Sequence, residues 1–400
     1  MPVTEFSVRS NEKTPLSFFS TKAFFSVVFH TVLCYNYLLS AEVGDVLNTH
    51  NVSSLLLEWY SAHYRPLPWR NEPSPYHVWV SEIMLQQTRI EAVLPYYRRF
   101  IETLPTIADL AQAPTDTLLK LWEGLGYYSR VRNMQKAAQI LVDRYHSELP
   151  ADYDLLLSLP GIGEYTAGAI ASIAYDISVP AVDGNVMRVL SRLTADDTNV
   201  LSTEGKKKFS SIAWELIPEQ NAGRFNQALM ELGETVCLPN GQPKCTQCPL
   251  RSECTACRLG RAQELPIRVK KTVRRVEVRK VALIRIDGHP PSVLLHKRSD
   301  NGLLAGLWEL PNTLAEDPLA SIPEFLAAHC IPGAALPASK HLFSHIEWHM
   351  TGTIYSLPTE ENFPADFAAV SLSQLKSAFP LPGAFRAYAS LLPELLNEEC

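Results

Sequence analysis

A short turn of proline and glycine, followed by a carboxylate, is the first feature of this sequence that could carry chemistry. Pro160–Gly163 reads P-G-I-G and separates two apolar segments, the second with apolar residues at helical spacing. Gly161 and Gly163 allow a tight turn and leave the backbone N–H groups open to a ligand. N–H groups at the start of a helix favour an anion such as a phosphate. Because Asp183 follows soon after, in V-D-G-N-V, the pattern predicts a protein that holds nucleic acid and attacks a sugar. The turn alone fits an ordinary helical hairpin equally well.

A second carboxylate, Glu82, lies in the apolar stretch 78–87, which reads V-W-V-S-E-I-M-L-Q-Q. We expect Ser81 to begin a helix, Glu82 to lie in its first turn, and its apolar face to continue to Leu94. A carboxyl group among apolar side chains has a raised pKa and stays protonated near neutral pH, as a general acid requires. The pair Gln86-Gln87 inside this apolar helix favours a functional role, because buried amides need partners. The alternative is a first-turn glutamate that only complements the helix dipole.

Four cysteines within 18 residues form a third group, spaced C-x7-C-x2-C-x5-C. They are Cys237, Cys245, Cys248 and Cys254. Thiolates at such spacing on loops rich in proline and glycine predict a metal site, and soft sulfur ligands select zinc or an iron–sulfur cluster. The spacing does not separate these two. Cys257 lies three residues further on and complicates the choice of ligands. The grouping is unlike a secreted disulfide scaffold and favours a reducing compartment such as the bacterial cytoplasm.

Two further stretches place aromatic residues beside arginines. Leu67–Arg70, L-P-W-R, predicts a rigid turn that presents an indole and a guanidinium. Residues 121–133 read L-W-E-G-L-G-Y-Y-S-R-V-R-N, and we expect Tyr127 and Tyr128 to project next to Arg130. An aromatic side chain there can wedge between stacked bases while arginines hold phosphates. The alternative is that these aromatic residues pack in the core.

Length and composition place these motifs in a chain with more than one domain. The sequence has 400 residues with 46% hydrophobic and 20% charged residues, as in globular proteins, and its net charge of −6 requires any DNA-binding face to be local. Residues 1–50 contain an apolar run broken by polar residues, which we interpret as an extension outside the fold. We predict a helical domain over 51–257, a basic interdomain linker over 258–280, and a β-rich domain over 281–400.

The β-rich part shows short apolar runs around turn residues. We expect strands over 281–286 and 293–295, a glycine-rich loop over 302–311 and a strand after 341–345, which reads H-L-F-S-H. Residues 391–396 predict a C-terminal helix.

The hairpin with its aspartate resembles the helix-hairpin-helix DNA glycosylases of the endonuclease III superfamily. The motifs S-E-I-M-L-Q-Q-T and V-D-G-N-V, in this order, make the chain similar to the MutY-type adenine glycosylases from about Leu55 to Leu395. The resemblance implies an α+β multidomain protein, with an all-α glycosylase domain that includes an iron–sulfur loop and an α/β Nudix-like domain.

The resemblance also implies the roles of the catalytic residues. Glu82 falls on the acid that protonates adenine, and Asp183 falls on the aspartate that stabilises the sugar cation, assisted by Asn185. The base must first leave the duplex. Tyr165 stands where endonuclease III-type enzymes carry a nucleophilic lysine, so the resemblance implies base removal without strong strand cleavage.

The same resemblance assigns DNA-reading residues and a cofactor. The adenine pocket falls on Trp69, Arg70, Leu85 and Gln227, and residues around an oxidised guanine fall on Gln87, Thr88 and Tyr127. The last domain matches an F-S-H loop that recognises 8-oxoguanine, here Phe343, Ser344 and His345. The four cysteines fall on a [4Fe–4S] loop usually spaced C-x6-C-x2-C-x5-C, so the first interval here is one residue longer. Residues 312–329 lack the metal motif of Nudix hydrolases, and we therefore expect recognition without hydrolysis.

Three alternatives remain open at this point. One is an endonuclease III-type enzyme that also cuts the strand, another is a DNA-damage binding protein without activity, and the third is a Nudix hydrolase with an accessory helical domain. The resemblance favours a monomer that binds duplex DNA with adenine opposite 8-oxoguanine or guanine, with no membrane partner. It leaves room for other repair proteins as partners.

Overall fold

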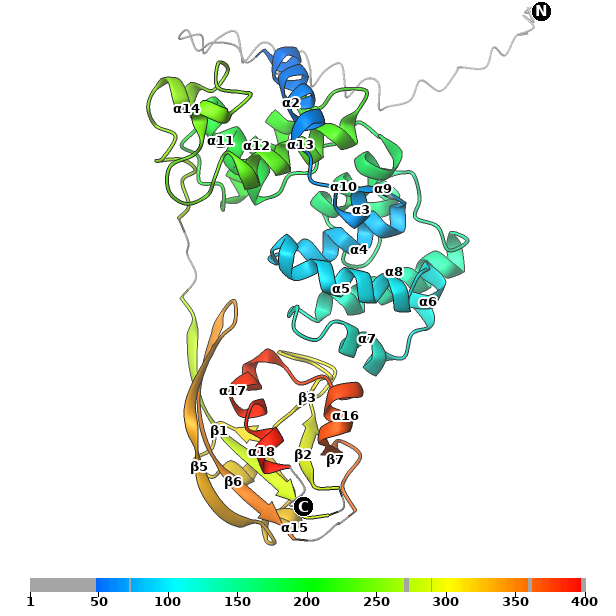
Figure 1. The fold of residues 1–400 in the computed structure, drawn as a ribbon, viewed down its shortest axis with the longest axis vertical. Helices are drawn as coiled ribbons and strands as arrows, with labels where there is room; N and C mark the ends of the chain where they lie inside the picture. The colour runs from blue at the N-terminus through cyan, green and yellow to red at the C-terminus, as the bar shows by residue number, and fades with distance from the viewer. Residues whose placement is uncertain (1–47, 72, 270–272, 289, 359–361, 397–400) are drawn as a thin grey trace, which may run out of the picture. The chain divides into compact units, whose positions relative to one another are not determined.

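The computed structural model describes residues 48–71, 73–269, 273–288, 290–358 and 362–396. Its first part consists of helices and its second part is built on one mixed sheet with short helices, which confirms the predicted α+β multidomain fold (Figure 1). The predicted extension lies outside the described residues as far as Leu47. Within the described part of the chain, no helix has both the length and the apolar content needed to cross a membrane.

In the described residues, the helical part begins with α2, Thr49–His63. Asn48 caps this helix because its side chain accepts a hydrogen bond from the N–H of Asn51 at 3.1 Å. The helices that follow have these bounds: α3 Pro68–Asn71, α4 Pro75–Leu85, α5 Ile90–Thr103, α6 Ile107–Gln112, α7 Thr115–Leu121, α8 Ser129–Arg144, α9 Tyr153–Leu157, α10 Glu164–Tyr175, α11 Gly184–Thr194, α12 Thr203–Leu216, α13 Ala222–Thr235, η1 Cys245–Gln247 and α14 Thr255–Arg258.

Two helices occupy the stretch in which the sequence predicted one. Ser74 caps α4 by accepting from the N–H of His77, and Pro75 occupies the first turn, so the helix starts well before Ser81. The helix ends at Leu85, and α5 begins anew at Ile90. The prediction of a helix start at Ser81 was therefore wrong, and Glu82 lies in the last turn of α4.

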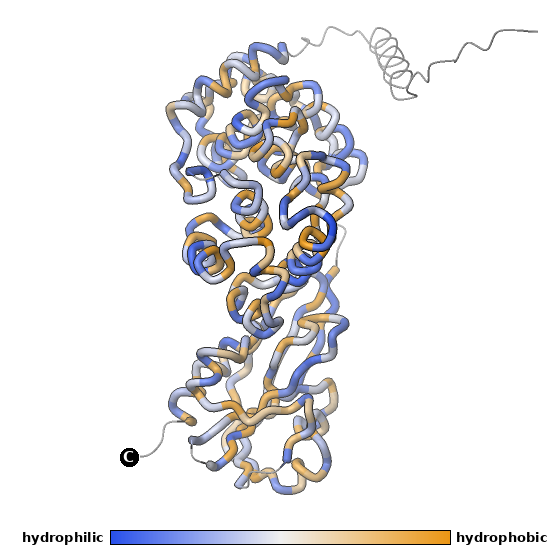
Figure 2. Tube along the Cα trace, turned by 90° about the vertical axis from the view of Figure 1, so that its right-hand side faces the viewer, coloured by the Kyte–Doolittle hydropathy of each residue, from blue (hydrophilic) through white to orange (hydrophobic). Residues whose placement is uncertain are grey.

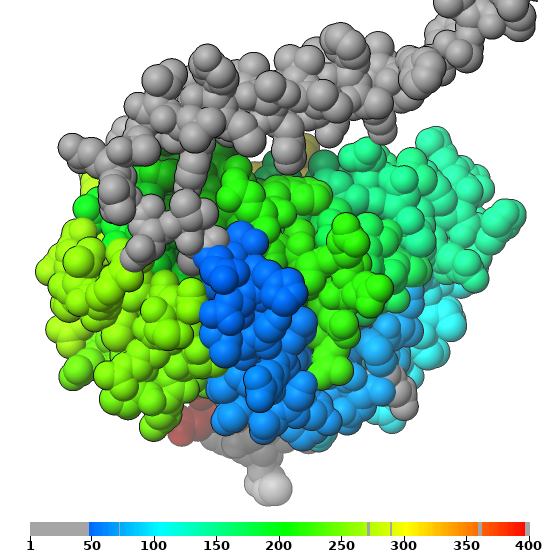
Figure 3. Space-filling view, turned by 90° about the horizontal axis from the view of Figure 1, so that it is seen from above, coloured from blue at the N-terminus to red at the C-terminus, as the bar shows by residue number. Residues whose placement is uncertain are grey.

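Segments from both ends of the helical part pack together. In Figure 3, α2 (blue) lies directly against the green and yellow-green segments that follow residue 200. The hydroxyl of Ser53 donates to the carbonyl of Leu216 at 2.8 Å, and the amide of Asn51 donates to Glu253 at 2.7 Å. These contacts hold α2 against α12 and the cysteine-containing loop.

Helix α10 connects the two halves of the helical part, because it packs on α4 on one side and on α13 on the other. Most of its residues are buried, among them Ala167, Gly168 and Ile170. A Cβ atom on Gly168 would lie 2.2 Å from the carbonyl oxygen of Pro180, so only glycine lets that segment approach α10. This close approach places the segment that carries Asp183 beside the helix that carries Tyr165.

The C-terminal part contains a seven-stranded mixed sheet with the order β3-β2-β1-β6-β5, in which β4 pairs with β1 and β7 pairs with β2. The strands are β1 Arg275–Ile286, β2 Ser292–Lys297, β3 Trp308–Glu309, β4 Asn312–Thr313, β5 Ile331–Leu342, β6 Ile346–Leu357 and β7 Phe367–Ser371. Strands β1 and β6 run parallel, from Arg275 opposite Ile346 to Ile286 opposite Leu357. Six residues of the predicted linker, 275–280, thus belong to β1.

Apolar side chains cover both faces of this sheet. One cluster contains Leu283, Trp348 and Phe385, and the other contains Ile284, Leu294 and Leu326. In Figure 2, orange (hydrophobic) and blue (hydrophilic) residues are interspersed along the chain. The short helices are η2 Pro318–Ser321, α15 Glu324–Ala327, α16 Leu372–Ser377, η3 Gly383–Phe385, α17 Arg386–Ala389 and α18 Leu392–Leu395. The last of these lies within the predicted C-terminal helix.

Candidate active site

A cavity of about 440 Å³ opens among α3, α4, α10, α11 and α13. Its size is in the range of small-molecule sites. Many of the residues predicted to act in catalysis or base recognition line it: Trp69, Arg70, Glu82, Leu85, Gln87, Thr88, Tyr165, Asp183, Asn185 and Gln227. The fold therefore brings together side chains that lie more than 150 residues apart in the sequence.

Glu82 is almost completely withdrawn from solvent, with 6% of its surface exposed. Its pKa is raised to about 7, chiefly by burial and also by the nearby Asp183, whereas a hydrogen bond from Tyr165 opposes the rise. Its place in the last turn of α4 also disfavours a negative charge, because the C-terminal end of a helix dipole is negative. This placement contradicts the alternative of a first-turn glutamate that complements the dipole.

Tyr165 lies in the first turn of α10, and its hydroxyl donates to the Oε2 atom of Glu82 at 2.5 Å. Burial raises the pKa of this phenol well above its usual value, and the two carboxylates add to the shift. The phenol therefore keeps its proton and orients Glu82. It offers no amine with which a sugar aldehyde could form a Schiff base.

Asp183 is the N-cap of α11 and accepts hydrogen bonds from three N–H groups. Its Oδ1 atom accepts from the backbone N–H of Asn185 at 2.9 Å and of Val186 at 2.7 Å, and its Oδ2 atom accepts from the side chain of Asn185 at 2.8 Å. Burial raises the pKa of Asp183, and these donors oppose the rise. The donors and the positive end of the helix dipole stabilise the carboxylate form.

A group of charges that the sequence analysis missed forms the wall of the cavity on α13. Glu231 has 1% of its surface exposed and pairs with two arginines, at 2.9 Å from Arg70 and in closer contact with Arg65. Arg65 also binds Glu234. The sequence contained one signal for this group. Polar residues at spacings of four and three, Gln227, Glu231 and Glu234, lie on one face of an otherwise apolar helix.

Hydrogen bonds connect Asp183 and its neighbour Asn185 to the cysteine loop. Arg188 donates to the Oδ1 atom of Asn185 at 2.8 Å and to the carbonyl of Cys237 at 2.8 Å. Arg192, one turn further along α11, donates to the Sγ atom of Cys237 at 3.1 Å. Both arginines are buried. Through them, α11 is hydrogen-bonded along its side to the cysteine loop, and Asp183 caps the N-terminus of the same helix.

Five thiols line a second, smaller cavity of about 30 Å³, next to α11. They are the four predicted ligands Cys237, Cys245, Cys248 and Cys254, together with Cys257. Within the residues that the structure describes, no three of the His, Cys, Asp or Glu side chains are placed to hold one metal ion. As a donor set, several thiols around one cavity suit either a zinc ion or an iron–sulfur cluster.

Comparison with known proteins identifies the family. The family model of the HhH-GPD superfamily base excision DNA repair protein matches residues 80–219, and that of the NUDIX domain matches residues 281–391. The adenine DNA glycosylase of Mus musculus is 36% identical over 386 residues, which cover 81% of this chain and 73% of the mouse protein. That of Buchnera aphidicola subsp. Acyrthosiphon pisum is 33% identical over 313 residues, or 78% of this chain and 88% of the relative.

The chain belongs to the adenine DNA glycosylase family. A solved structure of a non-covalent endonuclease III–DNA complex also resembles it, with 25% identity over 54% of this chain and a TM-score of 0.45. The assignment to the family rests on the sequence relatives and not on this structural likeness.

Two predicted DNA contacts of this adenine glycosylase family member lie outside the cavity. Gly161 has a φ of +78°, and a Cβ atom there would lie 2.7 Å from that of Asn133, so the hairpin turn requires glycine. Gly163 caps α10 without any side-chain hydrogen bond and has open space where a Cβ atom would be. The N–H groups of this first turn are thus accessible to a phosphate.

Tyr127 has 48% of its surface exposed, whereas Tyr128 is buried, so the prediction that both project was wrong. Arg130 does not project either. Its guanidinium donates to the carbonyl oxygens of Ile83, Gln86 and Gly126, among others, and lies over the ring of Tyr127. The prediction that Arg130 holds a phosphate fails because its donors already serve the backbone. Instead, this side chain joins the end of α4 to the loop that presents Tyr127.

Gln86 and Gln87 follow α4 and are not part of it, which corrects the prediction of a buried amide pair inside a helix. Gln87 is exposed and has a φ of +61°, and Gln86 donates weakly to Thr166 at 3.4 Å. Gln87 and Thr88 lie at the edge of the cavity.

The F-S-H residues form the turn between β5 and β6 of the Nudix-like part. Phe343 packs edge-on against Trp348, with ring centroids 4.9 Å apart, and its N–H donates to the carbonyl of Ile346 at 2.9 Å. Ser344 and His345 are exposed at the tip. The turn therefore exposes the two polar side chains, and the ring of Phe343 anchors it to the sheet.

Proposed function

We propose that this protein is a monofunctional adenine DNA glycosylase of base excision repair, acting on adenine opposite 8-oxoguanine or guanine. The observation that carries the proposal is the meeting of Glu82 and Asp183 in one cavity with different hydrogen-bond partners. Glu82 has a pKa of about 7 and accepts one hydrogen bond, from the hydroxyl of Tyr165, whereas Asp183 accepts three hydrogen bonds from N–H groups. Paired titratable groups in unlike environments indicate an acid and its anionic counterpart.

The proposed reaction begins when adenine leaves the duplex and enters the cavity. Glu82, protonated near pH 7, transfers its proton to a ring nitrogen of the base, and the bond from the base to the sugar breaks. The departing base takes the bonding electron pair. Asp183 stabilises the cationic sugar, directly or as a covalent ester, until water completes the hydrolysis. Asn185 holds the carboxylate through its side-chain amide.

Other side chains of the cavity support binding of the base. Trp69 and Leu85 give it apolar surface, whereas Arg70 and Gln227 offer polar groups. Arg70 is oriented by Glu231 at 2.9 Å, and Gln227 accepts from the hydroxyl of Tyr60 at 3.2 Å. We assign contacts with the DNA around the opposite base to Gln87, Thr88 and Tyr127. Contact with a phosphate is assigned to the turn that contains Gly161 and Gly163.

The cofactor that we propose is a [4Fe–4S] cluster held by Cys237, Cys245, Cys248 and Cys254. When bound, such a cluster supplies a rigid cross-link for the loop between α13 and α14. The buried arginines Arg188 and Arg192 would carry that rigidity to the N-terminus of α11, where Asp183 lies.

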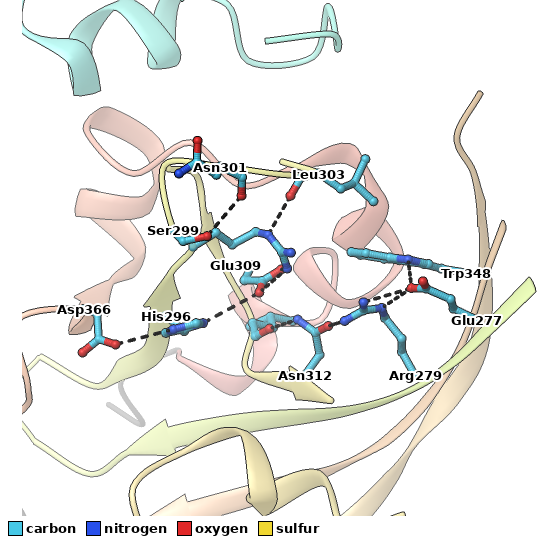
Figure 4. A network of polar contacts seen from close by, with 12 residues as sticks. Glu277, Arg279, His296, Ser299, Asn301, Leu303, Glu309, Asn312, Trp348 and Asp366 are labelled. Carbon is cyan, nitrogen blue, oxygen red and sulfur yellow. Dashed lines mark hydrogen bonds and ion pairs between the residues drawn. The ribbon is translucent and has the colours of Figure 1, made fainter. Parts of the chain in front are cut away.

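For the Nudix-like domain we propose recognition of 8-oxoguanine by Phe343, Ser344 and His345, without hydrolysis of nucleotides. Its buried carboxylates Glu277 and Glu309 are engaged by arginines (Figure 4). Release of pyrophosphate from oxidised dGTP by this protein would contradict the proposal.

The test is an assay of the purified full chain on a labelled duplex with adenine opposite 8-oxoguanine. Strand breakage is scored with and without heating in alkali, and a duplex with adenine opposite thymine serves as the control. We expect breakage only after alkali and only in the first duplex. Breakage without alkali would overturn monofunctional action, and equal breakage of both duplexes would overturn the specificity. No release of adenine would overturn the activity itself.

A further inference from the structure

Arg130, in the first turn of α8, connects two separate segments of the chain through its guanidinium. One terminal nitrogen, Nη1, donates to the carbonyl oxygen of Gln86 at 2.8 Å. The other, Nη2, donates to the carbonyl oxygen of Gly126 at 3.2 Å. Three more carbonyl oxygens accept from the same two nitrogens, those of Ile83, Met84 and Leu125. One side chain thus fixes both the backbone that follows α4 and the backbone that precedes α8.

Two of these carbonyl groups stand immediately before the side chains assigned to the DNA around the opposite base. Gln86 precedes Gln87, and Gly126 precedes Tyr127. The φ angles of Gln87 and Tyr127 are +61° and +47°, in the left-handed region. That conformation costs energy in a residue with a Cβ atom and persists only where its surroundings hold it. Because a carbonyl shares its peptide plane with the next N–H, Arg130 fixes the plane from which each left-handed residue starts.

Aromatic contacts support the same arrangement. The guanidinium of Arg130 lies 5.6 Å from the ring centroid of Tyr127 and 5.3 Å from that of Trp122. The indole N–H of Trp122 donates to the carbonyl oxygen of Gly126 at 3.0 Å, so this oxygen has two donors. Trp122 is fully buried, whereas Tyr127 has 48% of its surface exposed. The exposed ring therefore packs against a guanidinium that is anchored to the core.

We propose that Arg130 is a positioning residue for recognition of the base opposite adenine. The inference rests on the proposed function and adds a residue that acts through two others without touching the DNA. Arg130 sets the backbone at Gln87 and at Tyr127 together, so that both side chains meet the duplex in one fixed geometry. Ordering these side chains before binding lowers the entropy cost of association, so the contribution of Arg130 lies in affinity and not in the chemical step.

The experiment compares the full-length protein with variants of Arg130 and of the two side chains that it positions. R130K keeps the positive charge, but an ammonium group is a point charge and cannot serve both segments. R130Q is the second variant and replaces R130K if that protein does not fold, as judged by its melting temperature. Q87A/Y127A removes the two side chains, and R130K/Q87A/Y127A combines the changes. R144A, in the last turn of the same helix with 71% of its side chain exposed, is the matched control.

Affinity is measured for a duplex in which a 2′-fluorinated adenosine, which resists excision, stands opposite 8-oxoguanine. The single-turnover rate at saturating enzyme is measured on the ordinary duplex and is corrected for the fraction of active protein. We expect R130K to bind about tenfold more weakly, the cost of ordering two side chains on association. Its rate should stay within about threefold of the wild type, because Arg130 does not act on the chemical step. R144A should match the wild type in both measurements.

The combined variant shows whether Arg130 acts through Gln87 and Tyr127. Its affinity should be within about twofold of that of Q87A/Y127A, because a positioning residue has no effect once the side chains that it positions are absent. If the losses of R130K and Q87A/Y127A multiplied instead, Arg130 would act by another route and the inference would be wrong.

Two other results would overturn the inference. One is an affinity of R130K or R130Q within about twofold of the wild type, and the other is a loss of rate without a loss of affinity. Unchanged binding by Q87A/Y127A would remove the assignment of these side chains to DNA, and the inference with it. A wild type that neither releases adenine nor prefers this duplex over one with adenine opposite thymine would overturn the proposed function itself.

Discussion

Two pairs of buried or half-buried carboxylates, one pair in each domain, have different kinds of hydrogen-bond donor. In the cavity of the helical domain, Glu82 meets a phenol and Asp183 meets N–H groups of its own helix start. In the Nudix-like domain, Glu309 accepts two hydrogen bonds from Arg298, at 2.8 and 2.9 Å. Glu277 binds Arg275 and also Arg279, which Figure 4 shows beside it. Glu82 and Asp183 accept hydrogen bonds from neutral donors, whereas Glu277 and Glu309 accept them from arginine side chains.

The pKa values follow this difference. Burial is the main cause that raises the pKa of Glu82 to about 7, and the opposing effects of Tyr165 and Arg70 do not cancel it. Burial also acts on Glu277, but hydrogen bonds from Arg279 and Arg275 outweigh it and hold the pKa of Glu277 below its usual value. The indole N–H of Trp348 donates to the same carboxylate at 3.0 Å. A carboxyl group that is buried without a cation is suited to proton transfer, whereas one surrounded by donors with positive charge joins structural elements.

The largest expected effect in this comparison is that of replacing Asp183. The change Asp183→Asn keeps the shape of the helix cap but removes the negative charge to which we assign stabilisation of the sugar cation. We expect the single-turnover rate of adenine release to fall on the order of 10³-fold or more, as for removal of other electrostatic groups in active sites.

Affinity for the same duplex should change less than about tenfold, because the proposed DNA contacts are elsewhere. Asp154→Asn, at an exposed position on α9, is the matched control and should leave the rate unchanged. A rate for Asp183→Asn within tenfold of the wild type would contradict the assigned role.

The next effect concerns the pH dependence of the rate. Only protonated Glu82 can act as the acid, and its pKa is about 7, so the single-turnover rate should fall tenfold per unit above that pH. Between pH 7 and pH 9 the expected loss is about 50-fold, because the protonated fraction of Glu82 falls from about one half to about 1%. Binding of the duplex, measured at the same pH values, corrects for weaker association. A rate that is constant or rises over this interval would show that Glu82 is not the acid.

The sequence located most of this site because the decisive signals are local. Proline and glycine mark the hairpin, and Asp183 both caps a helix and stands next to Gly184 in a short polar run. The cysteines are recognisable from their spacing alone. Each of these features depends on a few neighbouring residues, so no knowledge of the fold is needed to place it.

The errors arose where the position of a residue depends on distant parts of the chain. The run 78–85 is apolar on every side because α4 is buried all round, so its periodicity did not reveal the helix start at Ser74. Arg130 was expected to face DNA, but backbone carbonyls at the end of α4 engage it. Glu231 was missed because its partner Arg65 lies 166 residues away in the sequence.

The third expected effect concerns a carboxylate of the Nudix-like domain. Glu309→Gln removes the charge that pairs with Arg298 and leaves a guanidinium partly buried. The Nudix-like domain should lose about 1–3 kcal/mol of unfolding free energy, the usual cost of leaving a buried polar group without its partner. Urea unfolding followed by tryptophan fluorescence measures the loss.

The rate of adenine release opposite guanine should not change in Glu309→Gln. Glu316→Gln, at a carboxylate with 95% of its side chain exposed, is the control and should alter neither stability nor rate. If Glu309→Gln slowed the release of adenine as strongly as a change at Glu82, the distinction between structural and catalytic carboxylates would be wrong.

The smallest effect is a pH dependence of stability in the helical domain. The pKa of Glu82 is raised on folding from about 4.5 to about 7, so the native state binds a proton more tightly than the unfolded chain does. Stability from this group is therefore complete below about pH 4.5 and is lost as the pH rises through about 7. Between pH 6 and pH 8 the wild type should lose about 1 kcal/mol that Glu82→Gln, which does not titrate, retains. The difference between their melting temperatures should then shift by about 2 °C in favour of the variant. A shift in the opposite direction would mean that Glu82 is buried as a stabilised anion, like Glu277, and the two regions would no longer differ.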